Sequence, residues 1–448
     1  MIVMKFGGSS LGTSAALTRV AGIVSERVSR RPVVVVSAIG NTTDHLAAAV
    51  ETAGDGRVEA ALDIVRDLVD ELRAITAPVL DDADALDRLL AEHADALTAL
   101  LGEGGDPSRW SERTDAILSH GERISSLIVT WLLRAQGLDA AHVDARDVIV
   151  TDDRFTEASP RLTTTYQRLR ERVRPSLASG RVVVLGGFIG RAGDGRPTTL
   201  GRGGSDYSAS IVGAGIGADE IQIWTDVDGI MTADPSVVPT ARPVEHLSFA
   251  EASELAYFGA RVLHPSTMLP AIEHGIPVRV LNSGRPSVSG TLIEAEGRGA
   301  PTPIKSIAYK EAITVVDIRS TRMLMAHGFL AEAFAVFDRH RTAVDVVSTS
   351  EVGVSLTIDR DDRLAEITSE LSAIAEVSHA GGQAIVCLVG DAIRDTPGVA
   401  AAVFGALETV NVRMVSQGSS RTNLSLVIDE RDLSVAIASL HAALFDAP

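Results

Sequence analysis

The stretch that decides the fold is Val3-Met4-Lys5-Phe6-Gly7-Gly8-Ser9-Ser10. In it an apolar strand leads into a lysine, and the lysine leads into paired glycines followed by two hydroxyls. Glycines allow backbone N–H groups to crowd around an anion, and a lysine beside them supplies a point positive charge. The stretch therefore predicts a phosphate cradle for a nucleotide, or alternatively a strand that simply ends in a glycine turn.

Lysine is rare in this chain, and its rarity favours the first interpretation. Lys5, Lys305 and Lys310 are the only lysines among 41 basic residues. A compact ammonium on a flexible stem is not interchangeable with the planar guanidinium that fills the other basic positions. The lysine at position 5 therefore points to a specific role beside the glycines.

Composition excludes several classes of protein. A length of 448 residues predicts two or three domains. The net charge of −18 argues against a nucleic-acid partner, because phosphate backbones bind basic surfaces. One cysteine, Cys387, excludes a disulfide framework and fits a reducing compartment. Without a start signal or a bilayer-length apolar run, we expect a cytoplasmic protein with no membrane partner.

Short β-branched runs alternate with longer helical stretches. The runs expected as strands are 2–4, 33–36, 181–185, 221–224 and 278–281. Continuous apolar strands separated by helices indicate a parallel sheet that is covered on both faces. Residues 44–101 predict a helical lobe without chemistry of its own, and Pro- and Gly-rich sequence from Ser283 to Pro303 marks a boundary.

Beyond that boundary the chain contains an internal duplication. Residues 328–334 align with 398–404, and residues 355–359 align with 425–429. An offset of about 70 residues is too long for a solenoid repeat, so two copies of one small domain are expected. Each copy is interpreted as a strand, a glycine turn, a helix and two strands, which is a ferredoxin-like arrangement. Such domains serve dimerisation alone or ligand sensing.

A second glycine-rich element lies between an apolar strand and an apolar helix. Residues 198–206 read Thr-Thr-Leu-Gly-Arg-Gly-Gly-Ser-Asp, which places Ser205 and Asp206 at or near a helix N-cap. Backbone N–H groups at a helix N-terminus bind anions, and Arg202 adds a fork that can grip a carboxylate. A plain turn and cap would explain the glycines and the aspartate but not Arg202.

Three further polar elements follow strand ends or open helices. They are Trp224–Pro235, Ser119–Arg123 and Ser37–Asp44. In open α/β sheets, ligands bind beyond the carboxyl ends of the strands. Glu122 is expected to open an apolar helix, where its carboxylate would by itself be only a partner of the helix dipole.

Two common nucleotide motifs are excluded by the sequence. None of the lysines follows a glycine, so there is no Walker loop. Residues 213–218 carry a glycine pattern similar to a dinucleotide fingerprint, but they continue a helix where that motif requires a preceding strand.

Taken together, these elements resemble an aspartate kinase of the amino acid kinase superfamily, over essentially the whole chain. The matching stretches are Lys-Phe-Gly-Gly-Ser-Ser (5–10), Ser-Ala-Ile-Gly-Asn-Thr-Thr-Asp (37–44), Ser-His-Gly-Glu (119–122), Thr-Thr-Leu-Gly-Arg-Gly-Gly-Ser-Asp-Tyr (198–207), Trp-Thr-Asp-Val-Asp-Gly-Ile (224–230) and Phe-Gly-Ala-Arg-Val-Leu-His-Pro (258–265). Their order and spacing make the resemblance specific.

The resemblance implies an α/β protein with a known domain order. It implies an amino acid kinase fold, a three-layer αβα sandwich with a mostly parallel sheet, over residues 1–295. Two ferredoxin-like ACT domains are expected at 304–378 and 379–448, and the strand near 304–310 has the option of pairing into the second ACT sheet. The homoserine dehydrogenase half of the bifunctional members is not expected.

The family's reaction transfers a phosphoryl group from ATP to L-aspartate, giving 4-phospho-L-aspartate and ADP for lysine, threonine and methionine biosynthesis. The attacking β-carboxylate is already ionised at neutral pH, so catalysis rests on positioning and charge neutralisation. Mg²⁺ is expected on the ATP phosphates, because no metal-binding set of side chains is apparent. Two alternatives stay open, namely a kinase of a related amino-acid carboxylate and a non-catalytic amino-acid sensor.

The resemblance also assigns roles to individual residues. Lys5 is expected to bridge the transferred group, Asp206 to organise Lys5, and Arg202 to hold the substrate α-carboxylate; these are the expected catalytic residues. The nucleotide is expected at Lys5, Gly7, Gly8, Ser9, Gly204, Thr225, Asp226, Met231 and Arg261. The substrate is expected at Thr43, Glu122, Phe188, Thr199, Arg202 and Ser205, with Glu122 holding the ammonium group.

Three residues depart from the family pattern near the expected nucleotide site. Met231, Ser236 and Arg261 stand where relatives often have Tyr, Arg and Lys. These departures bear on the affinity for ATP more than on the chemistry.

The first ACT copy matches the lysine-sensitive pattern of the family, which implies feedback by an amino acid, lysine or threonine. The expected effector residues are Met323, Gly328, Phe329, Leu330, Val344, Asp345, Thr349, Ser350 and Glu351. Two serines of that pattern are Ala326 and Ala343 here. ACT domains further imply a homodimer or a higher homo-oligomer.

Overall fold

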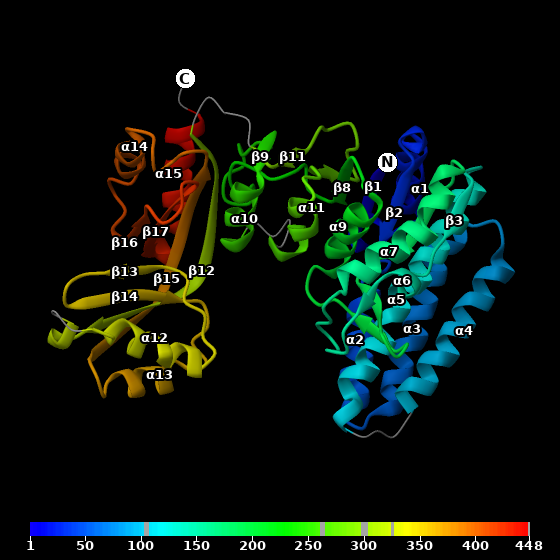
Figure 1. Ribbon diagram of the computed structural model, residues 1–448, viewed down its shortest axis with the longest axis horizontal. Coiled ribbons are helices and arrows are strands. Elements are labelled where there is room, and N and C mark those ends of the chain that lie inside the picture. Colours follow the sequence, from blue (N-terminus) through cyan, green and yellow to red (C-terminus); the bar gives the residue numbers. More distant parts are fainter. Residues whose placement is uncertain (103–106, 260–264, 297–302, 324–326, 447–448) are drawn as a thin grey trace. The chain divides into compact units, whose positions relative to one another are not determined.

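The computed structural model describes residues 1–102, 107–259, 265–296, 303–323 and 327–446, which fall into two units (Figure 1). The first unit contains Met1–Ile230 and Leu263–Ala295, and the second contains Met231–Val262 and Glu296–Pro448. Among the described helices, none combines the length and the apolar character that crossing a bilayer requires.

The first unit is built on a mostly parallel sheet. Within the unit the strands run in the order β3 (Ala140–His142), β5 (Val182–Gly186), β2 (Pro32–Val36), β1 (Ile2–Phe6), β8 (Glu220–Thr225), β10 (Val278–Asn282) and β11 (Thr291–Glu294). Neighbouring strands pair in parallel, except that β11 is antiparallel to β10. All the runs predicted as strands form part of this sheet. A smaller sheet contains β4 (Val150–Thr151), β6 (Ile189–Ala192) and β7 (Pro197–Thr199).

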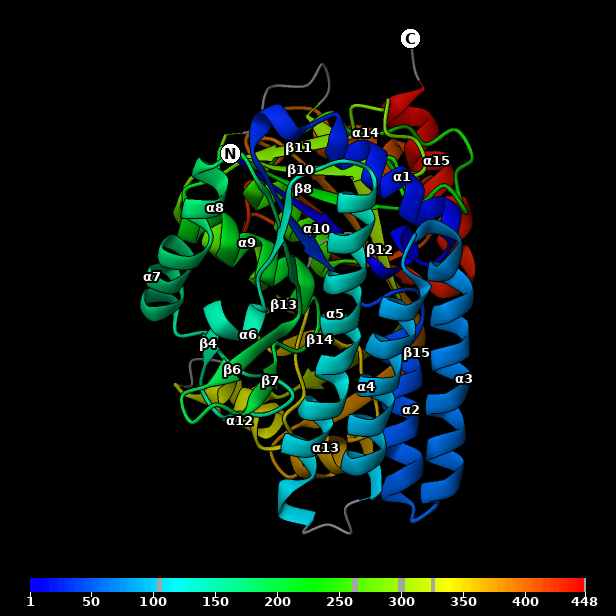
Figure 2. The ribbon, with the colours of Figure 1, turned by 90° about the vertical axis from the view of Figure 1, so that its right-hand side faces the viewer.

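Helices cover both faces of the large sheet. They are α1 (Ser14–Ser25), α2 (Thr42–Gly54), α3 (Val58–Thr76), α4 (Ala83–Gly102), α5 (Trp110–Ala135), α6 (Ala145–Val148), α7 (Leu162–Arg172), α8 (Arg174–Ala178), α9 (Gly204–Ile216) and α11 (Leu269–Glu273). Figure 2 shows α2, α3, α4 and α5 side by side as a bundle of long helices. The helical lobe predicted for residues 44–101 corresponds to α2, α3 and α4.

Strand β1 shows how one strand serves both helical layers. Ile2, Met4 and Phe6 belong to the core that contains α1 to α5. Val3, on the opposite face, lies beside Gly213 of α9. Side chains alternate between the faces of a strand, so Lys5 shares the face of Val3 and points toward α9. The predicted αβα layering is confirmed, and it directs the one polar residue of β1 toward a helix N-terminus.

The second unit contains the duplicated fold. Its strands are β12 (Ile304–Arg319), β13 (Val347–Thr349), β14 (Gly353–Ile358), β15 (Glu376–Gly390), β16 (Val412–Gln417) and β17 (Asn423–Asp429), and they form one six-stranded sheet in the order β13-β14-β12-β15-β17-β16. Every pairing in this sheet is antiparallel. Its helices are α12 (Phe329–Arg339), α13 (Leu364–Leu371), α14 (Val399–Ala406) and α15 (Leu433–Phe445); β9 (His246–Ser248) and α10 (Phe249–Tyr257) lie in the same unit.

The two copies start their first helices in the same way and are joined through their central strands. Gly328 and Gly398 are the N-caps of α12 and α14, with φ of 90° and 88°. Only glycine adopts that backbone conformation without strain, which explains why both copies have it there. The first half of β12 pairs with the second half of β15, as in Ile307 with Leu388, while the second half of β12 pairs with β14.

Candidate active site

A cavity of about 260 Å³ lies at the carboxyl ends of β1, β2 and β5. Its lining residues are Lys5, Ser37, Thr43, Glu122, Phe188, Gly201, Gly203, Gly204, Ser205 and Asp206. Strand ends, the first turn of α2, the middle of α5 and the first turn of α9 converge here. This edge of an open α/β sheet is where ligands bind.

Lys5 and Asp206, which both line this cavity, form an ion pair. Lys5 Nζ lies 2.7 Å from Asp206 Oδ1, and the two side chains are only 12% and 17% exposed. Asp206 lies in the first turn of α9, because the helix begins at Gly204. The lysine ammonium also lies close to the first glycine loop, since a Cβ on Gly7 would be 3.6 Å from Nζ. A positive charge is thus fixed between two glycine-rich loops.

The glycine pair after β1 lets two loops touch. A Cβ on Gly8 would lie 2.9 Å from the carbonyl oxygen of Gly40 and 3.1 Å from that of Ala38. The Gly40 N–H donates to the carbonyl oxygen of Gly8 at 3.2 Å. The loops after β1 and β2 can therefore approach each other this closely only because residue 8 has no side chain.

Glu122 places a carboxylate in the wall of the same cavity. Its Oε1 accepts a hydrogen bond from the Ala38 N–H at 3.2 Å, and its Oε2 has no partner among the described residues. Burial raises the pKa of Glu122 to about 8, although the Ala38 N–H and the charge of Lys5 act in the opposite direction. A buried carboxylate with an unused oxygen favours a cationic ligand group.

The expectation that Glu122 opens a helix is wrong, because it lies in the middle of α5. Glycine weakens a helix interior, so Gly121 favours a helix boundary on propensity alone. In the structure a Cβ on Gly121 would lie 2.9 Å from the Cβ of Ala38. Close packing of α5 against the end of β2 requires glycine there, and the helix continues through it.

The loop after β5 contributes Phe188 to the lining of the cavity. Phe188 has a φ of 63°, and its N–H donates to Ser208 Oγ at 2.9 Å. The Ser208 hydroxyl donates in turn to the carbonyl oxygen of Gly204 at 2.8 Å. A left-handed backbone at a residue with a side chain costs energy and is found most often where function requires it.

Replacement of Gly187 by alanine tests this close approach. A Cβ on residue 187 would lie 2.8 Å from both Cα and Cβ of Ser205, so the loop must move away from α9. We expect Gly187→Ala to destabilise the protein by roughly 1–3 kcal/mol and to reduce kcat/KM at least tenfold, measured by thermal unfolding and steady-state kinetics. Gly193→Ala, where a Cβ meets nothing within 4 Å, is the matched control. Equal kinetics for the two variants would contradict the prediction.

Asp115 is a site residue that the sequence analysis missed. Its buried carboxylate accepts hydrogen bonds from the Thr199 hydroxyl at 2.6 Å, from the Thr199 N–H at 2.9 Å and from the Thr156 N–H at 2.9 Å. Burial raises the pKa of Asp115, and these hydrogen bonds oppose that rise. Asp115 therefore fixes the segment that leads into the second glycine-rich loop. The available signal was an acidic residue among the inward-facing positions of α5.

The remaining predicted residues of the first unit lie at or near the cavity. Ser37, quoted only as part of a motif, lines it together with Thr43 and Ser205. The Thr199 hydroxyl is engaged by Asp115, so its predicted contact with substrate stays a prediction. Arg202 is exposed and makes no hydrogen bond or ion pair with any residue that the structure describes.

The residues predicted to bind the nucleotide extend to the neighbouring strand. Thr225 is the last residue of β8, which pairs with β1, and Asp226 follows it. The Thr225 hydroxyl donates to Asp226 Oδ1 at 3.1 Å. Ser9 lies in a single helical turn, Gly8–Ser10, directly after β1. Met231 belongs to the second unit, and Arg261 lies outside the described residues.

The predicted effector residues lie in the second unit around α12 and β13. Met323 lies in a short helical turn, and Gly328, Phe329 and Leu330 form the start of α12. Val344 and Asp345 precede β13. Thr349 is the last residue of β13, and Ser350 and Glu351 come directly after it. The side chain of Asp345 is 2% exposed and accepts a hydrogen bond from Lys310 Nζ at 3.1 Å. The hydroxyl of Tyr257, at the end of α10, also donates to Asp345 Oδ1, while Oδ2 has no partner among the described residues.

Comparison with known proteins identifies the family. The amino acid kinase family model matches residues 1–282, and an ACT domain model matches residues 386–444. Lysine-sensitive aspartokinase 3 of Escherichia coli is 37% identical over 100% of this chain and 99% of its own length. The chain belongs to the aspartokinase family. Aspartokinase 1, chloroplastic, of Arabidopsis thaliana is 37% identical over 99% of this chain and 80% of its own length.

Solved structures of aspartokinases have the same fold. E. coli aspartokinase III in complex with lysine and aspartate matches with a TM-score of 0.82 and 36% identity, over 99% of both chains. The same enzyme in complex with aspartate and ADP matches with a TM-score of 0.81 and 36% identity, over 99% of this chain and 100% of that one. The predicted amino acid kinase fold followed by ACT domains is confirmed.

Proposed function

We propose that this chain transfers the γ-phosphoryl group of ATP to the β-carboxylate of L-aspartate, the first step of aspartate-family amino-acid biosynthesis. The observation that carries the proposal is that the Lys5–Asp206 ion pair and the unused oxygen of Glu122 face one cavity. A substrate with an ammonium group and a second carboxylate matches that distribution of charge. Family membership and the aspartate complexes of E. coli aspartokinase III support the choice of substrate.

Each residue around the cavity has a separate role in the proposed reaction. A carboxylate attacking a phosphoryl group brings two anions together, so the principal requirement is neutralisation of charge. The ammonium of Lys5 would bridge the transferred group, and Asp206, 2.7 Å away, would hold it in position. The first turn of α9 presents N–H groups and the positive end of the helix dipole to the same space. Glu122 would bind the substrate ammonium and Arg202 its α-carboxylate.

Mg²⁺ is proposed to reach the site on the phosphates of ATP. The described residues contain no group of three His, Cys, Asp or Glu side chains able to hold the ion on their own. Mg²⁺ characteristically binds through one or two carboxylates together with substrate phosphates. When bound, the ion supplies further charge neutralisation to the phosphates beside Lys5.

An acceptor panel tests the proposed reaction. The protein is mixed with ATP, Mg²⁺, hydroxylamine and one acceptor, and the acyl hydroxamate is measured together with ADP release. We expect L-aspartate to give the highest kcat/KM, L-glutamate to react weakly, and succinate, which lacks the ammonium group, to react weakly as well. A higher kcat/KM with another carboxylate, or no product with any of them, would overturn the assignment.

We propose further that a catalytic domain at 1–295 is followed by two ACT domains, at 304–378 and 379–448. Amino-acid feedback acts through the first ACT domain. The ACT domains also associate the chain into a homodimer or a larger oligomer. The name of the E. coli relative, lysine-sensitive, and its complex with lysine favour lysine as the effector. Asp345 supports this choice, because its buried Oδ2 lacks a partner and suits an effector ammonium. Its hydrogen bonds to Lys310 and Tyr257 would connect the occupied site to α10.

Substitution of Asp345 tests the effector site. We expect Asp345→Asn to raise the lysine concentration for half-inhibition at least tenfold, since a neutral amide does not pair with an ammonium group (about 1.4 kcal/mol per tenfold). Inhibition curves with lysine and with threonine measure the effect, and the exposed Asp338→Asn of α12 is the control. Unchanged inhibition of Asp345→Asn would remove this residue from the effector site. Inhibition by threonine alone would change the effector.

A further inference from the structure

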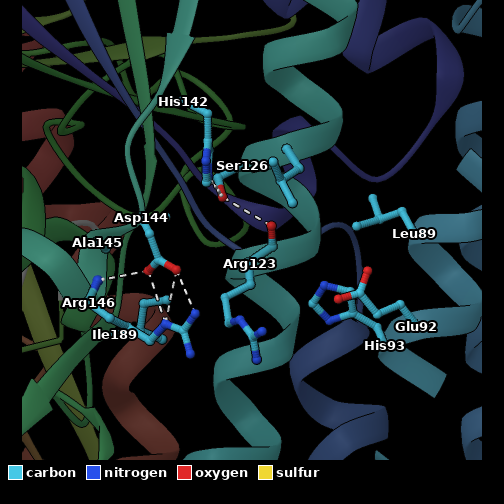
Figure 3. Close-up of a pocket in the computed structure, with 12 residues that line it drawn as sticks. Leu89, Glu92, His93, Arg123, Ser126, His142, Asp144, Ala145, Arg146 and Ile189 are labelled. Carbon is cyan, nitrogen blue, oxygen red and sulfur yellow. Dashed lines mark hydrogen bonds and ion pairs between the residues drawn. The ribbon is translucent and has the colours of Figure 1, made fainter. Parts of the chain in front are cut away.

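Arg123, the residue after Glu122, faces a second cavity of about 130 Å³ between α4, α5 and the segment around α6 (Figure 3). Its polar lining includes His93, Ser126, His142, Asp144 and Arg146. None of these residues has a role in the proposed transfer. A water needs about 10–15 Å³ by the same measure, so the cavity has room for a ligand of several heavy atoms.

The guanidinium of Arg123 has unused N–H donors and no direct ion pair with a described residue. Its Nη1 donates to His120 Nε2 at 3.2 Å, and its guanidinium makes no ion pair within 4.0 Å to any carboxylate of a described residue. A guanidinium carries several further N–H donors in a planar fork. Burial lowers the pKa of Arg123 and so does the charge of Arg146, while the carboxylates of Asp144 and Glu92 act in the opposite direction.

The two histidines beside Arg123 are neutral and do not form an ion pair with it. Because Arg123 can only donate, His120 Nε2 is an acceptor and Nδ1 carries the proton. His120 Nδ1 lies 2.8 Å from His93 Nδ1, and both rings are buried. Burial lowers the pKa of His93 to about 4 and that of His120 to about 2, so both are neutral at physiological pH.

The other wall of the cavity adds a second guanidinium. Arg146 binds Asp144 through two parallel contacts, Nη2 to Oδ2 at 2.6 Å and Nε to Oδ1 at 3.0 Å, so these two charges balance each other. Figure 3 shows the Arg123 side chain between this pair and the side chains of α4. Glu92 also lines the cavity but is exposed and forms no ion pair with Arg123. Arg146 and Asp144 thus pair with each other, while the Arg123 fork makes no direct ion pair with a described residue.

We propose that this cavity is a binding site for a small tetrahedral oxyanion of the phosphate class, with Arg123 as its main ligand and Arg146 beside it. Charge-assisted hydrogen bonds from a guanidinium fork to such oxygens would satisfy the donors that the protein leaves unused. A phosphate has the compact size and the several acceptor oxygens that the unused donors of Arg123 require. Water, the alternative occupant, would accept from these donors without forming an ion pair with Arg123.

The site shares its wall with the cavity that contains Glu122. Gly186 lines the second cavity, and a Cβ on it would lie 2.9 Å from the Cβ of Glu122 and 3.0 Å from its carbonyl oxygen. An anion that draws Arg123 toward itself therefore acts on the turn of α5 that positions Glu122. The affinity for aspartate should depend on the occupancy of this site. That dependence rests on the proposed function, whereas anion binding itself does not.

The test measures binding of inorganic phosphate by calorimetry and by the shift in unfolding temperature, with chloride at equal ionic strength as reference. We expect phosphate to stabilise the wild-type chain, and Arg123→Gln to raise the dissociation constant at least tenfold; the exposed Arg88→Gln of α4 is the matched control. Lys5→Ala removes the other position where phosphate could bind, in the active site. Stabilisation by phosphate should persist in this variant, because it comes from the cavity beside Arg123. Sulfate should replace phosphate, and acetate should not.

Several outcomes would overturn the proposal. They are no binding by the wild type, equal binding by Arg123→Gln, and loss of binding in Lys5→Ala. If Arg123→Gln does not fold, selenate soaked into wild-type crystals decides the question, since a selenium peak beside Arg123 supports the site and its absence refutes it. The dependence on the proposed function is tested separately. Phosphate should change the aspartate KM of the wild type but not that of Arg123→Gln, and binding without this change refutes the coupling alone.

Discussion

Lys5→Ala is expected to lower kcat for phosphoryl transfer by about a thousandfold, or about 4 kcal/mol of transition-state stabilisation. The Nζ of Lys5 is the ammonium held within the cavity, 2.7 Å from Asp206 and beside the loop of Gly7 and Gly8. Without it, nothing on β1 offsets the repulsion between the aspartate carboxylate and the phosphates. Hydroxamate formation at saturating ATP and aspartate measures the loss.

Lys5→Arg separates the charge from the geometry. A planar guanidinium keeps the positive charge but does not fit the space between the two glycine loops. We expect its kcat to lie between those of Lys5→Ala and the wild type. Asp206→Asn, which leaves the ammonium in place without its partner, should also be impaired. Lys5→Ala with near-normal kcat would remove Lys5 from the mechanism and, with it, the basis of the proposed function.

Glu122→Gln is expected to raise the KM for aspartate by about a hundredfold, or about 2.7 kcal/mol, with a smaller effect on kcat. The side chain is buried and its Oε2 is unused, so the ionised form gains most from an ammonium ligand. An amide of equal size removes that charge while preserving the packing. Steady-state kinetics with aspartate as the varied substrate measures the change.

The pH dependence of the wild-type KM follows from the same carboxylate. Burial raises the pKa of Glu122 to about 8, so the empty site is largely protonated at neutral pH. Binding of an ammonium group requires the ionised carboxylate, so each aspartate that binds releases a proton. KM should fall as pH rises toward about 8, by up to about tenfold per unit, and level off above it. A flat profile in Glu122→Gln is the control, and a flat profile in the wild type would contradict the assignment.

Stability gives a second, independent measurement of Glu122. A carboxyl whose folded pKa lies above its unfolded value binds more protons in the native state, so its contribution to the free energy of unfolding decreases as pH rises between the two values. Glu122→Gln removes that loss and should unfold at a higher temperature than the wild type at about pH 8. A variant that is less active and more stable separates a functional role from a folding defect.

Much of the fold follows from the sequence because its signals are contiguous. Buried parallel strands are short β-branched runs, and the duplication repeats its glycine at the same offset. Strand alternation also explains why Lys5 meets α9, since it shares the face of Val3. These features depend on residues that are close together in the sequence, so the sequence alone predicts them.

Other features of the site depend on contacts between distant segments. Gly121 looks like a helix boundary until the Cβ of Ala38 is known to lie against it. Asp115 shows its function only once Thr199 is beside it. The lack of a direct ion pair at Arg123 likewise emerges only when Asp144 is known to be bound by Arg146.

The shared central strands of the second unit constrain how this chain can be engineered. Residues 304–310 precede the first copy in sequence but pair with 385–390, in the strand that opens the second copy. A cut between the copies would remove the first half of β12 from the sheet of the second copy. The backbone N–H and C=O groups of β15 that pair with it would then have no partner. Chimaeras that exchange effector specificity with a relative should therefore transplant 304–446 as one cassette, because shorter grafts would split a sheet whose two halves are interlocked.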